Sequence, residues 1–206
     1  RDTVLSFNYD CLMDRSLARV SGRRWNPARG YGFSVTGGLD HWCDHTGRGR
    51  IPKGSIRLLK PHGSFNWVRN EADGFDLLAD EYAGRRHDAL LIVPPLWQKS
   101  FDEEPFPTVW VEARRVLSSA RALFVVGYSL PETDVYTQAL LRMDVGELEF
   151  LAIVNPDPEA RRRVHNALRS AVTRATHVLE LNALENLAQV IAESQGNLVE
   201  YPWISP

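Results

Sequence analysis

The sequence predicts an α/β fold, in which a parallel β-sheet is covered by helices on both faces. Short, mainly apolar runs alternate with helical segments through the second half of the chain. A continuous apolar run such as residues 122–126 is typical of a parallel strand that is buried on both faces. The length of 206 residues suits one domain, because chains usually split only beyond about 250–300 residues.

Turn and capping residues mark the elements of this second half. We expect strands at three mainly apolar segments, residues 122–126, 148–154 and 177–181. The segment 131–143 begins with Pro-Glu-Thr-Asp, and proline and acidic side chains suit a first helical turn. Asp157 and Pro158 are placed as the cap and the first residue of the next helix. Asn182 and Glu185 have the spacing of a capping box for the last helix.

The first half begins with the same alternation. We expect a strand at residues 3–7 and a helix at residues 10–20, with Met13, Leu17 and Val20 on one helix face. Further elements are expected as two strands and a helix, at residues 56–59, 90–93 and 108–119. Strands that alternate with helices in this way build a parallel sheet with right-handed crossovers, as in Rossmann-like domains.

Residues 21 to 89 have a different composition and form an aromatic-rich insertion. They contain most of the 14 glycines of the chain, together with several tryptophan and tyrosine residues. We expect irregular structure with short strands, which lies over the sheet rather than within it. Long segments of this kind are usually functional or disordered, and the aromatic side chains favour an ordered, substrate-side region. Residues 1–206 are then a single domain with an irregular insertion.

Composition excludes several classes of protein. The net charge of −2, from 24 basic and 26 acidic residues, argues against a general nucleic-acid surface. Two cysteines, Cys11 and Cys43, are too few for a disulfide framework or a four-cysteine zinc site, so no zinc is expected. No apolar run approaches the roughly 18–20 residues of a membrane span, and no secretion signal is present. We therefore expect a cytoplasmic protein without membrane or nucleic-acid partners.

Polar and small residues follow four of the expected strands, at the point where each strand ends. Ligands of open parallel sheets bind beyond the carboxyl ends of the strands, so we expect these residues to converge on one rim. They are Asn8-Tyr9-Asp10, Lys60-Pro61-His62-Gly63-Ser64, Gly127-Tyr128-Ser129 and Asn155.

Each of these residues also has a purely structural interpretation. Asp10 could cap the first helix, Gly127 could serve only its turn, and Asn155 could form an Asx turn before Pro156. His62 could be a loop histidine with ordinary partners. Its setting favours chemistry, because the small residues after it allow close backbone approach and aromatic residues alternate beyond them. We expect Trp67 and Trp97 to form part of the dry wall of this site.

Two other polar patterns favour structural interpretations. His41 and His45 would share one side of a helix, but the glycines around them favour a solvated loop over a metal site. The run Arg161-Arg162-Arg163 falls on the polar face of a helix, where solvation is favoured over an RNA contact.

Five segments in order, between residue 4 and about residue 158, resemble the sirtuin-like NAD-binding family, and within it the NAD-hydrolysing effectors of bacterial antiphage defence. They are Ser6-Phe7-Asn8-Tyr9-Asp10, Lys60-Pro61-His62-Gly63-Ser64-Phe65-Asn66-Trp67, Ile92-Val93-Pro94-Pro95 followed by Lys99-Ser100-Phe101, 126–134 and Ile153-Val154-Asn155-Pro156. By this resemblance Asn8 matches the asparagine that orients the reactive ribose and its water, and His62 matches the catalytic histidine. Four further positions match cofactor contacts: Asp10 at the nicotinamide amide, Gly127 and Ser129 at the phosphate and ribose side, and Asn155 at the adenosine ribose.

The resemblance implies hydrolysis of NAD, as substrate, to nicotinamide and ADP-ribose. Two departures qualify it: the zinc ribbon of sirtuin deacylases is missing, and the family's first strand and glycine-rich phosphate loop are expected before Arg1. The first departure disfavours deacylation, and the second predicts weak NAD binding by this segment alone. The alternatives are a module that senses NAD or ADP-ribose without turnover, and an ADP-ribosyltransferase. Family effectors are held inactive by a fused or separate sensor domain, and a homo-oligomer is compatible with the sequence.

Overall fold

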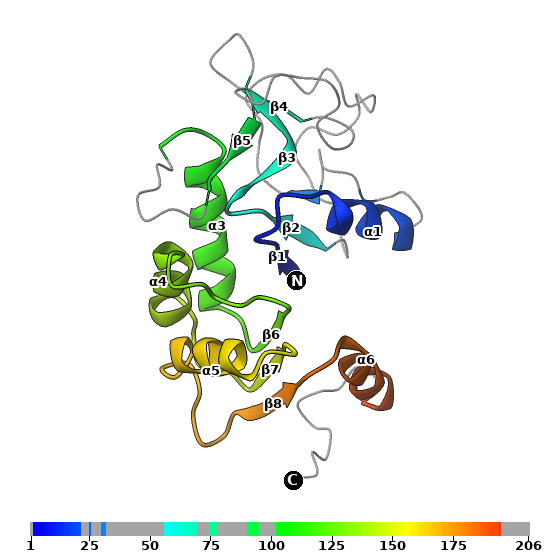
Figure 1. The fold of residues 1–206 in the computed structure, drawn as a ribbon, viewed down its shortest axis with the longest axis vertical. Helices are drawn as coiled ribbons and strands as arrows, with labels where there is room; N and C mark the ends of the chain where they lie inside the picture. Colours follow the sequence, from blue (N-terminus) through cyan, green and yellow to red (C-terminus); the bar gives the residue numbers. More distant parts are fainter. Residues whose placement is uncertain are drawn as a thin grey trace. The chain divides into compact units, whose positions relative to one another are not determined.

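The computed structural model describes residues 2–21, 25, 30–31, 56–69, 75–77, 90–94 and 102–194. The chain consists of two compact units, residues 1–113 and 114–206. The α/β class predicted from the sequence is confirmed, with strands and helices alternating along the second unit (Figure 1). The assignment of residues 1–206 to a single domain stays a prediction.

The second unit is the Rossmann-like part of the fold. Its elements are β6 (Ala122–Val126), α4 (Val135–Met143), β7 (Phe150–Val154), α5 (Pro158–Ala167), β8 (His177–Leu181) and α6 (Leu184–Glu193). The three strands are parallel in the order β6-β7-β8, so each connection crosses over through a helix. The predicted parallel sheet is therefore confirmed, and all three strands lie within the segments that the sequence predicted.

Helices cover both faces of this sheet, as predicted. On one face of β7, Leu151 and Ile153 pack with Val164 of α5. On the other face, Ala152 and Val154 pack with Leu187 of α6. Every residue of β7 is buried, and burial of each large aliphatic side chain contributes roughly 1.5–3 kcal/mol. The central strand therefore anchors the residues that follow its carboxyl end.

The helix starts of the second unit test the predicted caps. Asp157 accepts a hydrogen bond from the Glu159 N–H, and Pro158 is the first residue of α5, as predicted. The capping box predicted for α6 is wrong. The N-cap residue is Ala183, one position later than that pattern needs, and the Asn182 side chain accepts instead from Asn186 at 3.4 Å.

The first unit combines a parallel strand pair with an antiparallel sheet. Strand β1 (Thr3–Leu5) pairs in parallel with β2 (Arg57–Leu59), and α1 (Leu12–Val20) follows β1. The antiparallel sheet has the order β4-β3-β5, from β4 (Phe75–Leu77), β3 (Gly63–Arg69) and β5 (Leu90–Ile92). Helix α3 (Phe106–Ser118) begins in this unit and crosses the boundary to the second.

The described part of residues 21–89 contains the expected short strands, since β2 lies at the strand expected at 56–59 and β4 is also short. The seven-residue β3 was not expected, and the strand expected at 90–93 pairs antiparallel with it. The pattern of β3 concealed it, because polar Ser64 and Asn66 are buried beside the apolar residues. Buried polar side chains remove the alternation by which a half-exposed strand is usually identified.

The buried face of α1 also differs from the predicted one. Met13 and Val20 are 38% and 80% exposed, whereas Cys11, Asp14 and Leu17 are buried. Asp14 was not expected inside, and it is buried because it finds a charged partner there. In the described part of the chain, no helix is long and apolar enough to cross a membrane.

Candidate functional site

The parallel pairing of β1 with β2 brings together two of the segments singled out in the sequence. Both strands run the same way, so the residues after them leave the pair at the same end. The Ser6 N–H donates to the Leu59 carbonyl at 2.8 Å, and the Phe65 N–H donates to the Tyr9 carbonyl at 2.8 Å. The segment with Asn8 and the segment with His62 therefore lie side by side, as the sequence predicted.

His62 lies in the turn between β2 and β3 and is only 4% exposed. Its ring lies close to two aromatic side chains, with centroids 5.2 Å from Phe7 and 6.3 Å from Trp110. The His62 carbonyl accepts from the Val93 N–H at 2.8 Å, and the Pro61 carbonyl accepts from Trp110 Nε1 at 3.0 Å. The imidazole is thus held in an apolar setting by backbone bonds on either side.

Gly63 fixes the backbone directly after His62. Its φ is 86°, in the region that side chains other than glycine rarely adopt. A Cβ at this position would lie 2.1 Å from the Leu91 carbonyl oxygen of β5. The predicted close backbone approach is confirmed, and the approaching chain is the neighbouring strand.

Asn8 and Asp10 occupy the loop between β1 and α1. Asn8 is exposed, so its amide is accessible to a ligand. Asp10 Oδ1 accepts from the Leu12 N–H at 2.9 Å in the first turn of α1. The N-cap residue of α1 is Cys11, so Asp10 supports the start of the helix from one position before the cap. Its contact with a nicotinamide amide stays a prediction.

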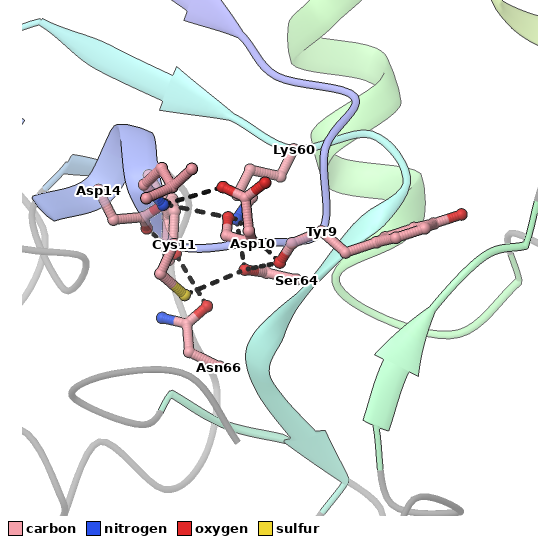
Figure 2. A network of polar contacts seen from close by, with 9 residues as sticks. Tyr9, Asp10, Cys11, Asp14, Lys60, Ser64 and Asn66 are labelled. Carbon is pink, nitrogen blue, oxygen red and sulfur yellow. Dashed lines mark hydrogen bonds and ion pairs between the residues drawn. The ribbon is translucent and has the colours of Figure 1, made fainter. Parts of the chain in front are cut away.

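A buried polar network lies beneath this loop, and sequence reasoning missed it (Figure 2). Lys60 is fully buried, and its Nζ donates to the Asp10 carbonyl at 2.6 Å and to Ser64 Oγ. The same ammonium lies 3.4 Å from Asp14 Oδ2. The available signal was a lysine at the end of an apolar strand, one of three lysines in the chain.

Tyr31 closes the network on the far side of Asp14. Its hydroxyl donates to Asp14 Oδ1 and lies 3.2 Å from Asn66 Oδ1. Burial raises the pKa of Tyr31 well above its usual value, and the neighbouring Asp14 carboxylate raises it further. Tyr31 therefore stays neutral at physiological pH and acts as a hydrogen-bond donor.

Three further predicted residues gather in the second unit, where β6 and β7 end. Gly127 has a φ of 69°, and its N–H donates to the Val154 carbonyl at 2.8 Å. Asn155 Nδ2 donates to the Tyr128 carbonyl at 3.4 Å, inside the turn that leads to Ser129. The structure thus brings Gly127, Ser129 and Asn155 together at the carboxyl ends of neighbouring strands.

Asn155 and Gly127 also show the structural roles that the sequence left open for them. Asn155 Oδ1 accepts from the Asp157 N–H at 3.0 Å, which is the Asx turn left open for it. Nothing lies within 4 Å of a Cβ placed at Gly127, so this glycine is needed for its φ and not for space. Leu130 takes a φ of 47° and is buried, a strained combination that recurs at functional turns.

The three arginines at positions 161–163 have two kinds of partner. Arg161 donates to the Asn155 carbonyl at 2.6 Å, and Arg163 Nε donates to the Ser129 carbonyl at 3.0 Å. Arg162 faces solvent, where it pairs with Glu159. The solvated-face interpretation therefore holds for Arg162, whereas its two neighbours bind the backbone of the turns around Asn155 and Ser129.

The predicted site residues fall into two groups. Asn8, Asp10 and His62 belong to the first unit, and Gly127, Ser129 and Asn155 belong to the second. Their convergence on one rim stays a prediction. Trp67, proposed as part of the site wall, is a fully buried core residue that packs edge-on against Tyr31.

Some predicted features lie outside the described residues. They are His41, His45, Trp97 and the Lys99-Ser100-Phe101 segment. Among the residues that the structure does describe, no group of three or more His, Cys, Asp or Glu side chains could hold a metal ion.

Comparison of the chain with models of known protein families, and with curated proteins, found no match in either case.

Proposed function

We propose that this chain hydrolyses NAD to nicotinamide and ADP-ribose, as a cytoplasmic effector of antiphage defence. The observation that carries the proposal is the juxtaposition of the Asn8 loop and the His62 turn at the end of the β1–β2 pair. An exposed amide and a shielded imidazole on adjoining segments are the two groups that ribose cleavage needs. The family resemblance described above supplies their assignment to NAD.

In the proposed reaction, a water oxygen bonds to C1′ of the nicotinamide ribose. The bond between C1′ and the pyridinium nitrogen breaks, and its electron pair leaves with nicotinamide, which becomes neutral. The transition state resembles an oxocarbenium ion, as in other glycoside hydrolyses. Asn8 orients the water or a ribose hydroxyl, and His62 accepts the proton that the water loses. Asp10 binds the carboxamide of the leaving group.

The surroundings of His62 suit a base that works away from bulk solvent. Phe7 and Trp110 lie close to its ring, and the backbone bonds of the turn limit its movement. With 4% of the residue exposed, substrate must reach the imidazole through a small opening. Catalytic hydrogen bonds often tighten only when substrate binds, so this burial is compatible with the role.

The same burial favours a second candidate, a module that binds NAD or ADP-ribose without turnover. Asp10 and Asn155 already hold local backbone groups, and His62 is largely covered. In this case the domain reports NAD to a partner or sensor domain and releases no nicotinamide.

The test is nicotinamide release from NAD by the full-length protein. Replacing His62 with alanine is expected to lower kcat by about 10²–10⁴-fold, the usual contribution of a general base. The matched control is His177→Ala, because His177 is exposed on β8, and it should retain activity. Unchanged turnover in folded His62→Ala protein excludes His62 from the reaction.

Other outcomes separate the alternatives. NAD binding without nicotinamide release supports the sensing module. Labelled ADP-ribose that appears on a macromolecule, rather than free in solution, supports an ADP-ribosyltransferase.

A further inference from the structure

Lys60 joins the two segments that form the candidate site of the first unit. Its backbone carbonyl accepts from the Gly63 N–H at 3.0 Å, which closes the turn that carries His62. Its ammonium donates to the Tyr9 and Asp10 carbonyls at 3.4 and 2.6 Å, in the loop that carries Asn8 (Figure 2). One residue therefore contacts both segments, through its two ends.

Other donors converge on the same loop. Ser64 Oγ donates to the Tyr9 carbonyl at 3.2 Å while accepting from Lys60, and the Phe65 N–H donates to that carbonyl at 2.8 Å. The loop between β1 and α1 has no regular secondary structure. Its backbone conformation is thus set by donors from the segment that continues past His62.

The burial of this ammonium is energetically costly. Lys60 is fully buried and Asp14 is 5% exposed, so both charges lose their hydration and depend on each other. Replacing a buried ion pair by apolar side chains is often neutral or stabilising, so stability alone does not account for the pair. What the ammonium provides, and an apolar side chain cannot, is several directed hydrogen bonds to the Asn8 loop.

A lysine beside a serine can also serve as base and nucleophile. Here both side chains belong to residues that are 0% exposed, so no substrate carbonyl reaches Ser64. Lys60 and Ser64 therefore act as hydrogen-bond donors to the backbone carbonyls of the loop.

We propose that Lys60 is a positioning residue, which fixes the Asn8–Asp10 loop relative to His62 for cleavage of the nicotinamide–ribose bond. This proposal rests on the proposed function. Misplacement of a catalytic group by about 1 Å can cost 10²-fold in rate. The loss of the loop contacts is therefore expected to appear in kcat more than in KM.

The test compares two double variants that differ in one property. Lys60→Met with Asp14→Asn removes both charges and the donor, so no unpaired charge stays buried. Lys60→Gln with Asp14→Asn has a similar volume but keeps an N–H donor for the carbonyls. The methionine variant is expected to lose at least about 10-fold in kcat, and the glutamine variant to recover part of that loss. Amide exchange over residues 6–12, followed by mass spectrometry, should be faster in the methionine variant.

Controls separate positioning from a general loss of stability. Leu77→Ala removes a fully buried side chain of β4 that takes no part in the loop contacts. It should lower the midpoint of urea unfolding while leaving kcat unchanged. Equal kcat in the wild type and the folded methionine variant overturns the proposal.

Two further results are decisive. If the double variants do not fold, the single variant Lys60→Gln replaces them, because its shorter side chain weakens the bonds to the Tyr9 and Asp10 carbonyls. Unchanged kcat and loop exchange in that variant overturn the proposal. If the wild type releases no nicotinamide, the proposed function fails. The exchange data then decide alone whether Lys60 orders the loop, because faster exchange supports the anchoring and unchanged exchange excludes it.

Discussion

Among the described glycines, Gly63 alone combines a left-handed φ, of 86°, with a carbonyl oxygen only 2.1 Å from where a Cβ would lie. The two constraints are independent, since the first concerns the residue's own backbone and the second concerns the neighbouring strand. Gly127, with a φ of 69° and open space around it, carries only the first.

Replacement of each of these two glycines by alanine should destabilise the fold to a different extent. Gly127→Ala should lower the free energy of unfolding by about 1–2 kcal/mol, the cost of a side chain in the left-handed region. Gly63→Ala should cost more, because β3 and β5 must also separate. Urea denaturation of both variants measures the difference. Equal losses in the two variants would mean that the Leu91 carbonyl moves aside at no cost.

At the scale of single elements, α5 depends on its first residue pair. Asp157 accepts from the Glu159 N–H at 2.9 Å, and Pro158 supplies a preset φ at the first helical position. The cap directly follows the Asx turn of Asn155, whose side chain accepts from the Asp157 N–H. The beginning of the helix and the end of β7 therefore form one continuous hydrogen-bonded corner.

The prediction for α5 concerns the loss of its N-cap, Asp157. Asp157→Ala should lower the free energy of unfolding by about 0.5–2 kcal/mol. Asp157→Asn keeps the acceptor and should stay within about 0.5 kcal/mol of the wild type, since the pairing of Asp157 with Arg163 is exposed. Chemical denaturation compares the three proteins. If Asp157→Asn lowers the free energy of unfolding as much as Asp157→Ala, the charge of Asp157 and not its capping bond stabilises the start of α5.

The elements also show why sequence reasoning succeeded in one part of the chain and failed in another. Strands β6 and β7 are apolar runs and β8 is a mainly apolar one, with helices between them, so local signals were sufficient. Strand β3 carries buried Ser64 and Asn66, whose partners come from distant segments. The same limit applied to Lys60 and Asp14, because no local pattern links two residues 46 positions apart.

The candidate site shows the same division. The rule that ligand-binding residues follow parallel strands correctly placed the Asn8 loop beside the His62 turn. That rule specifies where the chain leaves the strands, but not which contacts hold the loop in its conformation. The network beneath the loop depends on long-range pairing, and only coordinates reveal it.

For the molecule as a whole, folding links the stability of the chain to pH through its buried acids and bases. Tyr31 is the described residue with the clearest linkage, because burial first and the Asp14 carboxylate second raise its pKa well above the usual value. The unfolded chain releases this proton near pH 10, as an ordinary tyrosine does. Above that pH the folded state binds more protons than the unfolded state, so each further increase in pH lowers the free energy of unfolding.

The last prediction follows from this decrease of the free energy of unfolding with rising pH. The stabilisation due to the buried hydroxyl should be complete below about pH 10 and decrease as the pH rises toward the folded-state pKa of Tyr31. Tyr31→Phe removes the titrating group and should flatten this part of the stability profile. Tyr136→Phe is the matched control, because Tyr136 is 38% exposed on α4, and it should leave the slope unchanged. Urea unfolding followed by circular dichroism between pH 8 and 11 measures all three profiles. An identical slope in wild type and Tyr31→Phe would show that the hydroxyl ionises as readily in the fold as in the unfolded chain, and that its contact with Asp14 does not hold the proton.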